Sequence, residues 1–68
     1  MSHYRITIKN GKGAVKQVVS PDWWFDKADI NILATGIAVG AAQAYKKVVV
    51  EVQDVETGKI VFNKECRR

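Results

Sequence analysis

The sequence predicts an α+β domain with the element order ββαββ, in which one long helix packs on one face of a four-stranded, mostly antiparallel sheet. Apolar and polar residues alternate in both terminal thirds of the chain, and a glycine-containing turn interrupts each alternating segment. Between them lies an uncharged stretch with apolar residues at helical spacing. With 68 residues the chain has room for a single domain, so residues 1–68 are treated as one unit.

The first hairpin is expected over residues 3–20. Apolar and polar residues alternate along its first half, and Asn10-Gly11 then provides a strong hairpin-turn signal. A two-residue turn would place Val15 opposite Ile6, and a four-residue loop would place it opposite Ile8, so the register stays open. Both registers predict the same core face: Tyr4, Ile6, Ile8, Val15 and Val19.

A short turn is expected at 21–25 and the main helix at 26–45. Pro21 suits a first helical position, and Asp26 is a second candidate N-cap. Apolar residues recur in one helical stripe, which we expect to pack on the sheet. The stripe consists of Ile30, Leu33, Ala34, Ile37, Ala38, Ala41, Ala44 and Tyr45.

The second hairpin is expected over residues 46–65. Glu56-Thr57-Gly58 is typical of a three-residue loop with glycine in the left-handed conformation, and this loop would pair Val52 with Phe62. The tail, residues 66–68, is expected to fray. The predicted core face of this hairpin is Val48, Val50, Val52, Ile60 and Phe62.

The order of the strands is left open by these patterns. The helix crossover permits a mixed sheet in which the second and third strands run parallel. It also permits antiparallel orders with strand 1 beside strand 3, or strand 2 beside strand 4.

Composition argues against several classes of function. A single cysteine, Cys66, excludes an intrachain disulfide, and one cysteine with one histidine, His3, cannot build a Cys/His metal cluster. No nucleophile, base and orienting residue occur together, so we expect no enzyme, no catalytic residues, no metal and no cofactor. The N-terminal residues lack the apolar segment of a signal peptide, which favours the cytoplasm. The uncharged stretch falls short of the roughly 20 apolar residues that span a membrane.

The outer side of the predicted helix lacks the charged residues that a helix covering a sheet usually presents to water. From residue 30 to residue 45 no side chain is charged, and Gly36 and Gly40 stand one turn apart. This spacing allows another helix to approach closely, although the glycines could instead let the helix settle onto its own sheet. We call the candidate interface residues on this side the helix seam: Ile32, Gly36, Val39, Gly40 and Gln43.

The segment before the helix concentrates three of the six aromatic residues. Trp23 and Trp24 are candidate interface residues, because tryptophan is enriched where proteins bind partners. The alternative is a hydrophobic lid over one end of the core, in which the indole N–H groups reach backbone oxygens.

The first 20 residues carry four basic side chains and no acidic one, within a chain of net charge +4. Arg5, Lys9 and Lys16 are expected on the sheet face away from the core, with Lys12 at the turn. Such a hairpin could follow a nucleic-acid backbone. The alternative is that lysines on an edge strand prevent edge-to-edge association.

These observations favour a non-enzymatic interaction module that self-associates as a homodimer and acts as an accessory or regulatory factor binding another protein. A chain of this size buries only about 60% of its unfolded surface. Such domains usually gain stability from disulfides, a metal or a partner subunit, and only the last is compatible with this composition. The alternatives are a nucleic-acid-binding module and a small-molecule-binding dimer with its ligand beneath the tryptophan pair.

Overall fold

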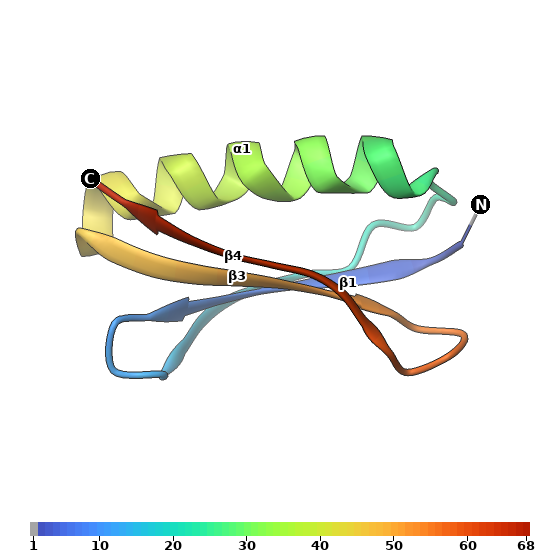
Figure 1. The fold of residues 1–68 in the computed structure, drawn as a ribbon, viewed down its shortest axis with the longest axis horizontal. Helices are drawn as coiled ribbons and strands as arrows, with labels where there is room; N and C mark the ends of the chain where they lie inside the picture. The colour runs from blue at the N-terminus through green and yellow to red at the C-terminus, as the bar shows by residue number, and fades with distance from the viewer. Residues whose placement is uncertain (1) are drawn as a thin grey trace.

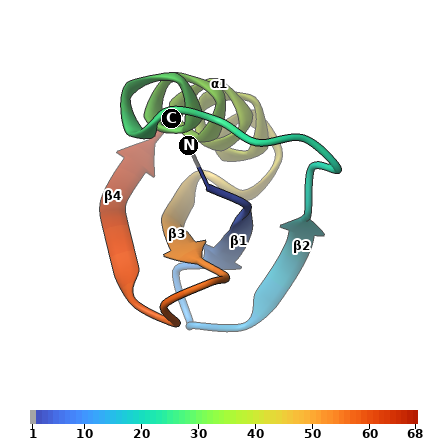
Figure 2. The same cartoon turned by 90° about the vertical axis from the view of Figure 1, so that its right-hand side faces the viewer.

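The computed structural model describes residues 2–68 and has the element order ββαββ. One helix lies along one face of a four-stranded sheet (Figure 1), and the α+β prediction is confirmed. Viewed along the long axis, the sheet curves beneath the helix (Figure 2). The elements are β1 (Tyr4–Asn10), β2 (Val15–Val19), α1 (Lys27–Tyr45), β3 (Lys47–Asp54) and β4 (Ile60–Arg67).

The sheet has the strand order β2-β1-β3-β4, with every neighbouring pair antiparallel. Of the orders that the sequence left open, the structure has strand 1 beside strand 3. Strands β1 and β3 therefore occupy the centre, and β2 and β4 form the two edges. The central pair supplies most of the core from the sheet side, because α1 lies over it.

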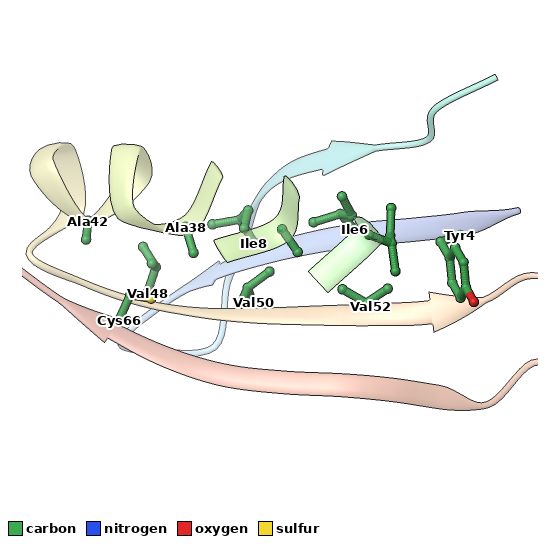
Figure 3. Packing of buried hydrophobic residues seen from close by; sticks show 11 residues of the cluster. Tyr4, Ile6, Ile8, Ala38, Ala42, Val48, Val50, Val52 and Cys66 are labelled. Atoms are coloured by element: carbon green, nitrogen blue, oxygen red, sulfur yellow. The ribbon is translucent and has the colours of Figure 1, made fainter. Parts of the chain in front are cut away.

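The core forms where a row of small residues on α1 meets branched residues on the central strands. The fully buried helix residues recur every fourth position, and three of the four are alanines. Because alanine is small, α1 can lie close to the sheet, with Ala38 and Ala42 pointing toward the strands (Figure 3). The buried core comprises Tyr4, Ile6, Ile8, Ile30, Ala34, Ala38, Ala42, Val48, Val50, Val52 and Cys66.

The loop of the first hairpin, residues 11–14, has the four-residue length of one predicted alternative, but both predicted registers are wrong. Val15 lies opposite Lys9, and the ladder shifts by one residue beside this pair. The Asn10 side-chain oxygen accepts backbone hydrogen bonds from Lys12 and Ala14, each at 2.9 Å, and so stabilises this loop. Val15 therefore shares the face of Lys9 rather than the core face, and is 55% exposed.

The helix begins at Lys27, one residue later than predicted, with Asp26 as the extended N-cap residue. The end of the predicted stripe is wrong: Ala44 and Tyr45 are exposed, and Ala42 is buried in their place. The reason is that the buried row advances in steps of four residues, which rotates it around the helix as α1 crosses the twisted sheet.

The loop of the second hairpin has Gly58 in the left-handed conformation, with φ at 76°, as predicted. Val52 pairs with Phe62, which confirms that register. A shift in the ladder follows, however, and it places Ile60 at 51% exposure, so the prediction that Ile60 faces the core is wrong.

The predicted fraying of the tail is also wrong. Strand β4 continues to Arg67, and the backbone N–H of Arg68 donates to the carbonyl of Lys46 at 2.6 Å. Cys66 pairs with Val48 and is only 7% exposed, on the helix side of the sheet. The end of the chain therefore closes the core under the last turn of α1.

Candidate interaction surface

The helix seam faces solvent along the middle of α1. Ile32 is 71% exposed and Val39 52%, while the two glycines and Gln43 are exposed beside them. A Cβ atom built on Gly36 or Gly40 would meet no atom within 4 Å. The interpretation that these glycines let the helix settle onto its own sheet is therefore wrong, because neither glycine faces the sheet.

Opposite charges stand at the two ends of the seam. Asp26 and Asp29 lie at the start of α1, and Lys46 and Lys47 follow its last residue. Lys46 ends the helix with φ at 69°, and its backbone N–H donates to the Ala42 carbonyl at 2.9 Å. This order of charges favours the helix dipole at both ends. It also gives the uncharged seam an acidic end and a basic end.

The two tryptophans lie outside the core at the acidic end of α1. Trp23 is 69% exposed and Trp24 48%, and their ring centroids lie 6.3 Å apart in an edge-on arrangement. Phe25 instead packs against the core, and its backbone pairs with that of Ser2. The predicted lid is thus formed by Phe25 alone, and both indole rings remain open to solvent or to a partner.

The ring of His3 lies against this aromatic pair. Its ring stacks on Trp24 with centroids 4.5 Å apart and 14° between the planes. Its Nε2 atom is buried without a hydrogen-bond partner among residues 2–68, as is the Oδ1 atom of Asn31. Sequence reasoning missed both atoms, because their burial depends on tertiary contacts that no local pattern reveals.

Three of the four basic residues of the first hairpin lie where the sequence predicts them, and Lys16 does not. The Lys9 ammonium pairs with Glu51 on β3 at 3.1 Å. Lys16, at the irregular point of the ladder, places its Nζ atom 6.0 Å from the ring centroid of Tyr45, on the helix side. Arg5 lies exposed on central strand β1, and Lys12 lies in the loop. Because Lys9 is ion-paired and Lys16 lies on the helix side, the four side chains do not make one continuous basic face, and the nucleic-acid hypothesis stays a prediction. Of the four, only Lys16 lies on an edge strand.

The sheet face away from α1 carries paired charges beside the exposed Val15 and Val18. Glu65 lies between Arg67, at 2.6 Å, and Lys47, at 3.8 Å. The hydrogen bond from Arg67 is the main reason that the pKa of Glu65 lies below its ordinary value. Desolvation opposes this shift, and the positive charges of Arg67 and Lys47 add to it. Such a face suits water, as is usual for the open side of an antiparallel sheet.

The part of the chain that the structure describes shows no metal site, pocket or membrane-spanning helix. Within residues 2–68, no three His, Cys, Asp or Glu side chains gather to hold a metal ion, and no pocket is present. Over the same residues, no helix combines the length and the apolar character needed to cross a membrane. Comparison of the chain with protein-family models, curated proteins and solved structures gave no match.

Proposed function

We propose that this protein is a non-enzymatic interaction module that self-associates through the helix seam. In this role it serves as an accessory or regulatory factor that binds another protein, and we expect it to act in the cytoplasm. The seam is a part of the helix surface that is both uncharged and exposed.

The open space around Gly36 and Gly40 is the observation that carries the proposal. A glycine inside a helix costs about 1 kcal/mol relative to alanine. Nothing within residues 2–68 offsets that cost, because neither glycine allows a closer contact with the sheet. A second helix crossing at this point would offset it, since two glycines one turn apart let two backbones approach closely.

The size of the seam predicts a weak contact. A helix of 19 residues is about 28 Å long and about 10 Å wide, so its outer side offers roughly 300 Å² to a partner. A standard stable interface buries about 800 Å² on each side. The exposed Trp23 and Trp24, next to the start of α1, would enlarge the contact. We therefore expect association at tens of micromolar and above.

Sedimentation equilibrium over a wide concentration range tests the proposal. We expect a monomer–dimer equilibrium. Gly36→Leu should raise its Kd by at least about tenfold, equivalent to about 1.4 kcal/mol. The matched control is Ala44→Leu, which adds a leucine at another exposed position of α1 outside the seam. A protein that stays monomeric at every concentration, or equal effects of the two variants, would contradict the proposal.

A further inference from the structure

The charges of the molecule are separated along its long axis. The start of α1 and the loop between β3 and β4 lie at the same end as the N-terminal residues (Figure 1), where Val55 N–H donates to the His3 carbonyl. Five acidic residues gather there, against the basic residues Arg5, Lys27 and Lys59. The five are Asp22, Asp26, Asp29, Asp54 and Glu56.

The opposite end is basic. The end of α1, the loop of the first hairpin and the end of β4 meet there, as the Arg68–Lys46 hydrogen bond and the contact of Lys16 with Tyr45 show. Glu65 is the acidic residue among six basic ones. The six are Lys12, Lys16, Lys46, Lys47, Arg67 and Arg68.

We propose that the occupant of the helix seam is a second copy of this chain in antiparallel orientation, an inference that rests on the proposed self-association. A two-fold axis across the middle of the seam places the acidic end of each copy over the basic end of the other. A parallel arrangement would bring like charges together at both ends. The antiparallel arrangement also opposes the two helix dipoles, which is favourable.

The spacing along α1 fixes which residues meet. When the axis crosses midway between Gly36 and Val39, positions whose numbers sum to 75 face one another. Gly36 then lies opposite the partner's Val39 and leaves room for its side chain. Asp29 lies opposite the partner's Lys46, and both are exposed and free of any ion pair within residues 2–68. Each dimer therefore gains this ion pair twice.

Disulfide trapping tests the orientation. Two single-cysteine chains are needed, Ile32→Cys and Gln43→Cys, each with Cys66→Ala so that the native thiol is absent. In the proposed dimer these two positions face each other, and a mixture of the chains forms a mixed disulfide under mild oxidation. Either variant alone forms no disulfide. In a dimer of one variant, the introduced cysteines of the two copies lie about 16 Å apart along the helices, which is too far for a disulfide.

The outcomes separate this inference from the proposed function. Mixed disulfides in the mixture, without cross-linking of either chain alone, are the expected result. Cross-linking of each chain with itself indicates a parallel dimer, and dimers without cross-links indicate another contact surface, so either result overturns the inference. The parallel result leaves the proposed function standing. A monomer at every concentration overturns both.

Charge exchange provides a second test that needs no cysteine. Asp29→Lys or Lys46→Asp alone places like charges together in the antiparallel dimer, and we expect each to raise Kd about threefold or more, most clearly at low salt. The double variant restores opposite charges and returns Kd toward that of the unchanged protein. Circular dichroism checks that each variant remains folded. Equal Kd values for all four proteins would overturn the antiparallel orientation.

Discussion

The two sides of α1 are built from similar residues and meet opposite surroundings. The inner side presents Ala34, Ala38 and Ala42, which are at most 1% exposed against the sheet. The outer side presents Gly36 and Gly40 in open space. On the inner side, contact with the strands limits the size of each residue. On the outer side nothing in the chain imposes such a limit, so the small residues there need an explanation from outside the chain.

The same substitution on the two sides gives the largest expected difference. Ala38→Leu adds three carbon atoms to a fully buried position, and we expect it to lower the free energy of unfolding by about 3 kcal/mol through overpacking. Ala44→Leu at an exposed position should change it by less than about 0.5 kcal/mol. Urea denaturation at low protein concentration measures both. Equal losses would mean that the helix meets the sheet along a different row.

Replacing a glycine by alanine should change the free energy of unfolding in opposite directions on the outer side of α1 and in a turn. Gly40→Ala should raise the free energy of unfolding of the monomer by up to about 1 kcal/mol, because alanine favours the helix and its methyl group meets nothing. Gly58→Ala is the matched control. It should lower stability by about 1 kcal/mol, because Gly58 has a φ of 76°.

The same Gly40→Ala variant should weaken self-association while it stabilises the monomer. Denaturation below the dimer Kd and sedimentation above it separate the two effects. A Gly40→Ala monomer that is less stable would indicate a packing role for this glycine within the chain.

The smallest expected effect on stability concerns Glu65, which lies on the open face of the sheet. Unlike the helix seam, this face carries paired charges. Its pKa lies below the ordinary value of 4.5 because Arg67 donates a hydrogen bond to the carboxylate. A lowered folded-state pKa stabilises the fold above the unfolded value, and this contribution is lost as the pH falls through the folded value. The contribution is small because the carboxylate is solvent-exposed.

Titration of Glu65 by NMR, compared between the unchanged protein and Arg67→Gln, measures this effect. We expect the midpoint to rise toward the ordinary value in the variant. The stability difference between the two proteins should be present at neutral pH and disappear in acid. An unchanged midpoint would mean that Arg67 does not hold the carboxylate in solution.

Local patterns predicted the elements of this fold because each has a distinct period and a distinct turn. The alternation around Val50, the loop at Gly58 and the uncharged helix each place residues on the correct side. The order of the strands could not be predicted in the same way, because the crossover by α1 is compatible with more than one neighbour for β1.

Wrong predictions of the side-chain face arise where one irregular residue in a strand reverses the face of the residues that follow it. The irregular ladder beside Lys9 moves Val15 and Lys16 to sides that a regular hairpin does not predict. The stacking of His3 on Trp24 and the burial of Cys66 depend on segments far apart in the chain. For the candidate surface, composition identified the helix seam, but only the structure shows that its glycines contact nothing.

The buried position of Cys66 makes its labelling rate a measure of how often strand β4 opens. It is the single thiol of the chain, and it lies 7% exposed at the end of β4. A thiol reagent can reach its Sγ atom only when that strand opens, so the rate of labelling reports the opening free energy of β4 in an unmodified chain. Comparing this rate with that of global unfolding reveals whether the last strand leaves the sheet by itself.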